Sequence, residues 1–363
     1  MKQQIIHIMN AECRMPQWRM AHPVNFTLNA DEHIAIVGPN GGGKSMFVDV
    51  LVGRHPAFPD QIIYDFSPAA SNLVSDNIQY ITFRDTYGGD NDRTYFLQQR
   101  WNQMEIDIET PTAGKVLEEA FLLSGDDSPE RRAMQQQLYD IFQMRPLLDK
   151  YIILLSSGEL RKLKLASALF VQPRVLILDN PFIGLDADTR SQLKDLLNTI
   201  ATQPHQHTRL MLVLSKTDEI PDFMTHVVEV SKMAVGDKRA RACYINKVIL
   251  PHHVLSTEKE QAIRRLPSTQ KDYHSDIVLD MHHVNIQYGD RTILRDLSWT
   301  VRNGERWALS GQNGAGKSTL LSLICADNPQ AYACDITLFG RQRGSGESIW
   351  DIKKHIGYVS PEM

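Results

Sequence analysis

The chain alternates short apolar runs with longer segments in which apolar residues recur at helical spacing. The apolar runs predict strands at residues 5–9, 26–28, 33–37, 78–83, 175–178, 210–214 and 306–310. Helical spacing predicts helices at residues 44–52, 112–123, 129–144, 160–170 and 191–201. Strands that alternate with helices are typical of an α/β fold with a largely parallel core sheet. The polar stretch 84–92 and the helices after it predict a helical lobe at about residues 93–160.

Two glycine-rich turns each lie between a predicted strand and a predicted helix. Residues 38–45 read GPNGGGKS and residues 311–318 read GQNGAGKS, so both fit the pattern G-x-x-x-x-G-K-[ST]. In such a loop, backbone N–H groups surround phosphate oxygens, the lysine reaches the β- and γ-phosphates and the serine can bind Mg²⁺. A glycine-rich turn that binds nothing is the alternative, and the repeated strand–loop–helix context favours nucleotide binding. The candidate contacts are Gly38, Asn40, Gly41, Gly43, Lys44, Ser45 and Met46, and Gly311, Asn313, Gly314, Gly316, Lys317, Ser318 and Thr319.

The two loops belong to a longer repeat. At the offset that separates Gly38 from Gly311, residues 26–32 align with residues 299–305. This similarity indicates a duplicated domain rather than a short solenoid repeat. The second copy stops at Met363, soon after its phosphate loop, and we expect it to be incomplete because such a domain needs more chain to close a core. We therefore expect one domain at residues 1–230, a linker at 231–275 and part of a second domain at 276–363.

Composition narrows the class of protein. Of the 363 residues, 42% are hydrophobic and 23% are charged, and the net charge of −4 gives no basic field for nucleic acid. No apolar run approaches the ~20 residues of a membrane helix, and residues 1–4 lack the apolar core of a signal peptide. Four scattered cysteines argue against a disulfide framework or a metal site and fit a reducing cytoplasm. The basic stretch 231–275 has few aromatic residues, which favours a solvated linker over a nucleic-acid-contacting arm.

Further candidate nucleotide contacts lie between the two loops. The predicted strand 175–178 is followed by Asp179, whose carboxylate can hold Mg²⁺ through water. The N-terminal N–H groups of a predicted helix offer a second anion site. The residues that precede or open this helix are Ser156, Ser157, Gly158 and Glu159. The segment PFIGLD at residues 181–186 ends in an aspartate. The candidate metal ligands are Ser45, Asp179 and Ser318.

The order of these motifs resembles that of the ATP-binding cassette (ABC) ATPases over nearly the whole chain. The resemblance implies a P-loop NTPase fold of ABC type, with a mixed or parallel core sheet and a helical subdomain. Residues 155–159 would form the signature loop and Asp186 would be the D-loop aspartate. ATP and Mg²⁺ would be the cofactors of an ATPase in which two cassettes pair head to tail. Tyr288 would stack on adenine in the second site, whereas Met15 stands there in the first, with Trp18 close enough to substitute.

Residues 293–299, 338–347 and 349–360 further resemble the tandem ABC ATPases of the ModF or photorepair-protein type, which are associated with molybdate-transport genes. This resemblance implies an ATP-binding component of a transporter, cytoplasmic or peripheral on the inner face of the cytoplasmic membrane, that meets membrane subunits through its helical lobe. It also pairs Lys317, Ser318 and Tyr288 with residues 156–158 across the cassette interface. A soluble tandem ATPase acting on a ribosome or nucleic acid, or a nucleotide-binding regulator, is the alternative.

The first site departs from the family pattern at three positions. Asn180 stands where the family has a glutamate that polarises the attacking water, and an amide cannot accept the water's proton. Lys216 replaces the switch histidine, and Phe83 replaces the Q-loop glutamine, for which Pro361 stands in the second copy. We therefore expect the first site to bind ATP and hydrolyse it slowly, since loss of a general base costs ~10²–10⁴ in rate. The alternative is that positioning and electrostatics suffice without the base.

Overall fold

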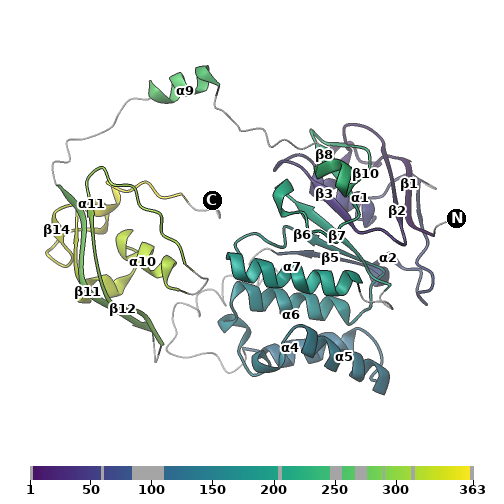
Figure 1. Ribbon diagram of the computed structural model, residues 1–363, viewed down its shortest axis with the longest axis horizontal. Helices are drawn as coiled ribbons and strands as arrows, with labels where there is room; N and C mark the ends of the chain where they lie inside the picture. Colours follow the sequence, from purple (N-terminus) through teal and green to yellow (C-terminus); the bar gives the residue numbers. More distant parts are fainter. Residues whose placement is uncertain are drawn as a thin grey trace. The chain divides into compact units, whose positions relative to one another are not determined.

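The computed structural model describes residues 3–58, 61–83, 110–202, 207–245, 256–265, 276–288, 291–311 and 315–359. The chain divides into two compact units (Figure 1). Among the described residues, the first unit runs to residue 245 and the second begins at residue 256.

The first unit is built on a seven-stranded sheet and a smaller antiparallel sheet. The large sheet has the order β10-β8-β3-β7-β6-β5, and β9 pairs with β8. Its strands are β3 (Ile34–Val37), β5 (Ile78–Thr82), β6 (Val175–Asp179), β7 (Arg209–Leu214), β8 (His226–Ser231), β9 (Ala234–Val235) and β10 (Arg239–Ala240). All but β9 and β10 run parallel. The predicted α/β fold with a largely parallel core sheet is confirmed, and β3, β6 and β7 are the continuous apolar runs that a sheet covered on both faces requires.

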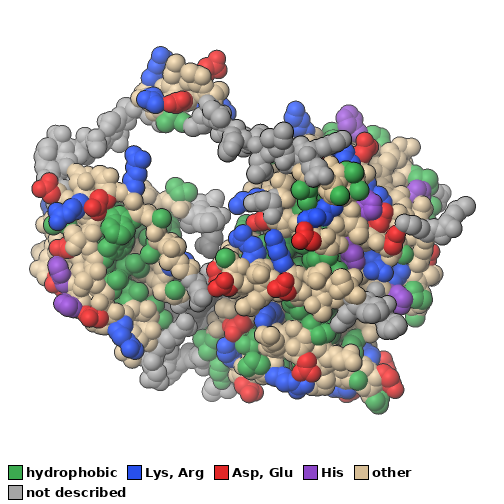
Figure 2. Space-filling view, in the orientation of Figure 1, with side chains coloured by type: hydrophobic (Ala, Val, Ile, Leu, Met, Phe, Trp, Pro, Cys, Tyr) green, Lys and Arg blue, Asp and Glu red, His purple; other side chains and the backbone are tan. Residues whose placement is uncertain are grey.

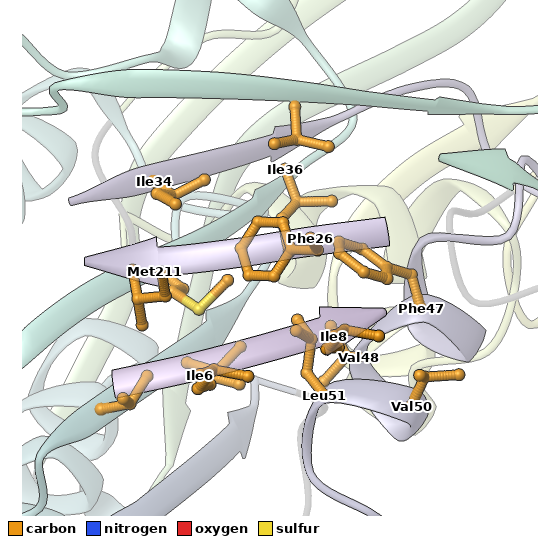
Figure 3. Packing of buried hydrophobic residues seen from close by; sticks show 14 of the residues in the cluster. Ile6, Ile8, Phe26, Ile34, Ile36, Phe47, Val48, Val50, Leu51 and Met211 are labelled. Atoms are coloured by element: carbon orange, nitrogen blue, oxygen red, sulfur yellow. The ribbon is translucent and has the colours of Figure 1, made fainter. Parts of the chain in front are cut away.

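The small sheet and the helix after the first phosphate loop form the main core. The small sheet has the order β2-β1-β4, with β1 (Gln4–Ala11), β2 (Val24–Asn29) and β4 (Ile62–Tyr64). Helix α1 (Lys44–Leu51) packs its apolar face against β1 and β2 and against β3 and β7 of the large sheet (Figure 3). Phe47 of α1 meets Phe26 of β2 edge to face, with ring centroids 5.3 Å apart. This packing fixes the position of the phosphate loop at the start of α1.

The helical part of the first unit contains α4 (Ala113–Leu123), α5 (Pro129–Ile141), α6 (Ser157–Leu169) and α7 (Ala187–Thr202), with short turns η2 (Arg145–Leu147) and η3 (Ile152–Leu154). Arg131 of α5 donates to the carbonyls of Phe121 and Phe170, at the ends of α4 and α6. The guanidinium groups of Arg131 and Arg132 also lie over the buried Phe121 ring, at 4.5 and 4.4 Å. The predicted helical lobe therefore includes α4 and α5, while its residues 93–109 lie outside the described residues. Shorter elements of this unit are η1 (Pro16–Trp18), α2 (Val74–Asn77) and η4 (Thr217–Glu219).

Residues 231–245, which we expected in the linker, pack on the first unit. They form β9, β10 and α8 (Arg241–Ile245), and Tyr244 of α8 is buried. Lys238 donates to Glu32 Oε2 at 2.6 Å and to the carbonyl of Thr27 at 2.8 Å, which fastens this segment to β2 and the turn after it. In the described part of the remaining linker, α9 (Thr257–Arg264) has no buried residue.

The second unit is a four-stranded antiparallel sheet with the order β12-β11-β13-β14. Its elements are β11 (Ile277–Tyr288), β12 (Arg291–Arg302), α10 (Lys317–Ile324), η5 (Pro329–Ala333), β13 (Asp335–Leu338), β14 (Arg341–Gln342) and α11 (Ile349–Lys353). The order β12-β11-β13 repeats the order β2-β1-β4 of the first unit, in agreement with the sequence repeat.

The predicted strand at residues 306–310 is wrong. These residues form no strand, and the side chains of Trp307 and Leu309 are 58% and 43% exposed. The corresponding strand of the first unit, β3, is hydrogen-bonded by β7 on one side and β8 on the other. Among the described residues of the second unit no strand pairs in parallel, so the backbone groups of residues 306–310 lack the neighbours that would hold them in a sheet.

The segment Arg341–Glu347, part of the stretch that resembles the tandem family type, contains a buried ion pair. Arg343 Nη1 donates to Glu347 Oε1 at 2.6 Å, and the two side chains are 0% and 2% exposed. The N–H of Gly344 also donates to Glu347, and the guanidinium of Arg343 lies over the ring of Tyr332 at 4.5 Å. One carboxylate therefore organises the whole turn after β14.

We expect Glu347→Ala to lower the free energy of unfolding of the second unit by about 3–5 kcal/mol, because it leaves a buried arginine without its counter-ion. The matched control is Glu260→Ala, which breaks the exposed Glu260–Arg264 pair at the same i,i+4 spacing and should cost less than about 1 kcal/mol. Urea unfolding followed by tryptophan fluorescence reports on this unit through Trp299 and Trp307. Equal effects of the two substitutions would contradict the expectation.

A buried histidine at the start of β3 makes the first unit sensitive to acid. His33 Nδ1 accepts a hydrogen bond from the N–H of Leu210 at 3.0 Å, which requires an unprotonated Nδ1. Burial, assisted by the charge of Arg209, lowers the pKa of His33 to about 4. The unfolded chain, with a histidine pKa of about 6.5, then binds more protons between pH 6.5 and pH 4, so stability falls as the pH falls through this window.

We expect the titration of His33 alone to lower the free energy of unfolding by about 3 kcal/mol between pH 7 and pH 4. The measurement compares urea unfolding of the wild type and His33→Gln across this range, so that the carboxylates common to both cancel. The free energy of unfolding of the wild type relative to His33→Gln should be lower by that amount at pH 4 than at pH 7. A difference that stays constant with pH would show that His33 does not titrate in this window.

Candidate nucleotide-binding site

The first phosphate loop connects β3 to α1 and depends on glycine at specific positions. Gly43 is the N-cap of α1 with φ 103°, in the left-handed region that favours glycine. A Cβ added to Gly38 would lie 1.9 Å from the carbonyl oxygen of Val230 at the end of β8, so the loop passes too close to that strand for any side chain. Lys44 Nζ donates to the carbonyls of Gly38 and Pro39 at 2.7 and 2.9 Å. The loop thus curls around one ammonium group.

Lys44 is the central charge of this loop. The residue is 7% exposed, and burial lowers the pKa of its ammonium while the nearby Asp179 carboxylate acts in the opposite direction. Ser45, in the first turn of α1, is exposed, and Met46 is partly buried. Gly41 has φ 75°. The arrangement presents a cation and a helix N-terminus at one point, which is the chemistry that binds phosphate groups.

Asp179, at the end of β6, is held by two donors. Tyr80 of the neighbouring strand β5 donates its hydroxyl to Asp179 Oδ2 at 2.8 Å. Asn180 Nδ2 donates to Asp179 Oδ1 at 2.9 Å. Burial, followed by the charge of Asp179, raises the pKa of Tyr80, so its hydroxyl remains a donor. Tyr80 belongs to no sequence motif, and its place beside Asp179 follows from a strand order that the sequence alone leaves open.

Asn180 is fixed in place by its neighbours. Its backbone has φ 49°, a left-handed conformation that asparagine tolerates better than most residues, and its N–H donates to the carbonyl of Val213 at 2.8 Å. Ser215 Oγ lies 3.0 Å from Asn180 Oδ1 and 2.9 Å from Asn40 Oδ1 of the phosphate loop. Lys216, the next residue, is exposed. Ser215, which the sequence reasoning missed, therefore joins the phosphate loop to the segment after β6.

The predicted signature loop begins α6 with a capping box. Ser156 Oγ accepts from the N–H of Glu159 at 3.3 Å, and Glu159 Oε2 accepts from the N–H of Ser156 at 2.7 Å. Lys150 donates to Glu159 Oε1 at 2.9 Å. Burial acts to raise the pKa of Glu159, but the N–H of Ser156 and the ammonium of Lys150 lower it overall. These contacts explain why α6 begins at Ser157 rather than at the predicted residue 160; the side chain of Ser157 lies outside the described residues.

Gly158 and Asp186 together fix the approach of α7 to α6. A Cβ on Gly158 would lie 2.6 Å from Cγ2 of Thr189, so glycine allows the two helices to approach closely. Asp186 Oδ1 accepts from the N–H of Thr189 at 2.8 Å and caps α7, which therefore starts at Ala187 rather than at the predicted residue 191.

Phe83, which we predicted to stand in place of the Q-loop glutamine, is buried at the end of β5. The guanidinium of Arg161 from α6 lies over its ring at 5.5 Å. Arg161 also donates to the carbonyl of Ile183, just before Asp186. Phe83 thus packs between the core sheet and α6, and the sequence reasoning did not identify its partner Arg161.

The second phosphate loop is described in part. Lys317 Nζ donates to the carbonyl of Gly311 at 2.6 Å, and Gly316 is the N-cap of α10 with φ 89°. Ser318 is exposed and Thr319 partly buried in the first turn of α10. Gln312, Asn313 and Gly314 lie outside the described residues, as does the side chain of Tyr288. The lysine contact and the left-handed glycine match those of the first loop.

The candidate adenine contacts of the first unit lie on the segment between β1 and β2. Trp18 stacks on His55, with ring centroids 4.3 Å apart, so one face of its ring is occupied. Met15 is 49% exposed. Met20 of the same segment lies beside the phosphate loop, since its Cε would be 3.3 Å from a Cβ on Gly43.

The residues at the first site suit Mg²⁺. Ser45 and Asp179 supply a hydroxyl and a carboxylate, the hard oxygen ligands that Mg²⁺ prefers alongside water and phosphate oxygens. Among the residues that the structure describes, no group of three or more His, Cys, Asp or Glu side chains could hold a metal ion. None of the helices in the described part of the chain has the length and apolar character needed to cross a membrane.

A phosphate loop at the carboxyl end of a parallel strand, with a carboxylate at the end of the next strand but one in the same sheet, defines a P-loop nucleotide-binding protein. The profile of the family described as "ABC transporter" matches residues 21–183 and 294–363. The chain belongs to the ATP-binding proteins of this ABC transporter family.

Its relatives include the ABC transporter ATP-binding protein ModF of Escherichia coli, which is 34% identical over 99% of this chain and 70% of the relative. An uncharacterized ABC transporter ATP-binding protein of Schizosaccharomyces pombe is 32% identical over 94% of this chain and 68% of the relative. Among solved structures, cbiO1 from Clostridium perfringens aligns with a TM-score of 0.53 and 18% identity, over 73% of this chain and 97% of that one. An ATP-binding cassette of an ABC transporter in its ADP conformation aligns with a TM-score of 0.52 and 14% identity, over 69% and 96%. At these identities the two structures indicate a shared fold.

Proposed function

We propose that the first nucleotide site binds ATP with Mg²⁺ but hydrolyses it slowly, within the ATP-binding component of an ABC transporter. The observation that carries this proposal is the hydrogen bonding of the Asn180 side chain. Its amide group is held by Asp179 on one side and by Ser215 on the other. An amide so engaged contributes no proton acceptor for an attacking water.

Two further side chains support a slow first site. Lys216 is a fixed cation, which can attract a γ-phosphate but exchanges protons poorly at neutral pH. Phe83 is an apolar side chain packed against Arg161, so it offers no amide for water or metal at the end of β5. Three departures at one site thus act in the same direction.

The second phosphate loop would complete its site with the signature loop of the first cassette. In this proposal Lys317, Ser318 and Tyr288 bind one ATP together with Ser156, Ser157 and Gly158. Ser45 and Asp179 would hold Mg²⁺ at the first site, and Ser318 would do so at the second. Asp186 would lie beside the paired cassette.

The partners would be membrane subunits that meet the helical part around α4 and α5, which would place the protein on the inner face of the cytoplasmic membrane. The second candidate is a soluble nucleotide-binding regulator, which the slow first site would also suit. Acidic and basic side chains are interspersed on the face of the first unit in Figure 2, an arrangement that does not favour nucleic acid as the partner.

The test is to measure ATP affinity and steady-state hydrolysis on these 363 residues and on a chain that continues through a second signature loop. We expect the 363 residues to bind ATP with negligible turnover, and the longer chain to hydrolyse it at the site of the second phosphate loop. Substantial turnover by the 363 residues alone would show that the first site hydrolyses ATP despite Asn180, and would refute the proposal.

A further inference from the structure

We propose that Tyr80 is a positioning residue that orients Asp179 toward the Mg²⁺ bound with ATP at the first site. This inference rests on the proposed function, because it requires that the site bind ATP with Mg²⁺. It assigns a role to a residue outside the motifs that define the site.

The contact crosses two neighbouring strands of the core sheet. In the parallel register of β5 and β6, Tyr80 pairs with Ile177 and Thr82 with Asp179. The tyrosine side chain therefore extends along the sheet to place its hydroxyl 2.8 Å from Asp179 Oδ2. The guanidinium of Arg54, just beyond α1, lies 5.7 Å from the centre of the Tyr80 ring. The ring is thus held at its face while its hydroxyl reaches the carboxylate.

The two donors on Asp179 restrict the carboxylate to one orientation. Tyr80 binds Oδ2, and Asn180 binds Oδ1. A carboxylate has about four acceptor positions, so both oxygens keep lone pairs for a metal ion or its water. Hydrogen bonds to the outer side of a ligating carboxylate fix its direction, and loss of such a partner typically costs ~10–100-fold in metal affinity.

If the Tyr80 hydroxyl had only a structural role, its removal would not change the dependence of ATP binding on Mg²⁺. The chain offers a matched control for this distinction. Tyr64 of β4 also donates its hydroxyl within the first unit, to the backbone carbonyl of Leu51 at 3.1 Å. Tyr64→Phe and Tyr80→Phe remove the same single oxygen from a partly buried ring. Only Tyr80→Phe changes a group that faces the proposed metal.

The experiment measures ATP affinity by calorimetry over a series of Mg²⁺ concentrations and in excess EDTA. A Lys317→Ala background leaves the first phosphate loop as the proposed binding site. We expect Tyr80→Phe to raise the Mg²⁺ concentration for half-maximal ATP binding ~10–100-fold, with the affinity in EDTA unchanged. Tyr64→Phe should leave both quantities at their wild-type values.

The outcomes separate the two proposals. If Tyr80→Phe binds ATP with the wild-type dependence on Mg²⁺, the positioning role is overturned while ATP binding at the first site stands. Equal weakening with Mg²⁺ and with EDTA would assign Tyr80 a purely structural role and would also overturn the inference. If the chain with an intact Lys44 shows no ATP binding at all, both the inference and the proposed function fail.

Discussion

Replacing Lys44 with alanine is expected to lower ATP affinity at the first site by at least ~10²-fold. The ammonium of Lys44 donates to two loop carbonyls, so it already lies at the centre of the curve that the loop forms. Bound phosphate oxygens would compete for these donors, and each hydrogen bond between charged groups contributes about 1.5–3 kcal/mol. Alanine removes both the donors and the charge, and leaves the glycine backbone in place.

Calorimetry in a Lys317→Ala background measures this loss at the first site. Lys216→Ala is the control, because it removes an exposed cation that directly follows Ser215 and lies outside the phosphate loop. We expect it to weaken binding less than ~10-fold, as suits a solvent-screened charge. Equal losses in the two variants would indicate attraction by net charge, and unchanged affinity in Lys44→Ala would refute the phosphate-loop assignment.

The sequence predicts those parts of the fold that local pattern controls. Apolar runs located β3, β6 and β7 to within one residue at either end, because strands buried on both faces need an apolar residue at every position. The starts of α1, α4 and α5 were predicted to within one residue. Those of α6 and α7 were missed by three and four residues, since their N-terminal turns hold polar side chains that apolar periodicity does not register. The strand β8 was not predicted, although it lies beside β3, the strand that leads into the first phosphate loop.

The wrong prediction of a strand at residues 306–310 has a different cause. The run Trp307–Leu309 has the same apolar character as β3, but a parallel strand requires partners that come much later in the sequence. Local pattern therefore gives the tendency to form a strand, and long-range pairing decides whether the strand exists.

At the candidate site, the motifs identified Lys44, Asp179 and Asn180, but not the side chains that hold them. Tyr80 and Ser215 belong to no motif, and each acts through a hydrogen bond to a residue distant in sequence. Spacing rules describe contacts within one segment. Contacts between the ends of neighbouring strands depend on strand order, which the sequence alone left open.

Substituting glutamate for Asn180 is expected to raise ATP turnover at the first site by ~10²–10⁴-fold, the range that a general base contributes. The effect requires a chain in which a second signature loop completes that site. A carboxylate at position 180 adds the missing proton acceptor, and Ser215 can donate to it as it does to the amide. Two costs oppose the gain. Asp179 loses the donor Asn180 Nδ2, and the backbone at φ 49° disfavours glutamate relative to asparagine by about 1 kcal/mol.

Asn180→Gln is the matched control, because glutamine has the length of glutamate but keeps an amide. Both variants carry the same backbone cost and the same extra methylene, so their ratio of kcat isolates the proton acceptor. We expect the turnover rate of Asn180→Gln to stay at or below that of the wild type. Single-turnover measurements with Mg²⁺ and ATP in excess over Kd separate the chemical step from binding. Equal rates in the two variants would mean that the base does not limit turnover. The limit would then lie with Phe83 and Lys216, the other departures at this site.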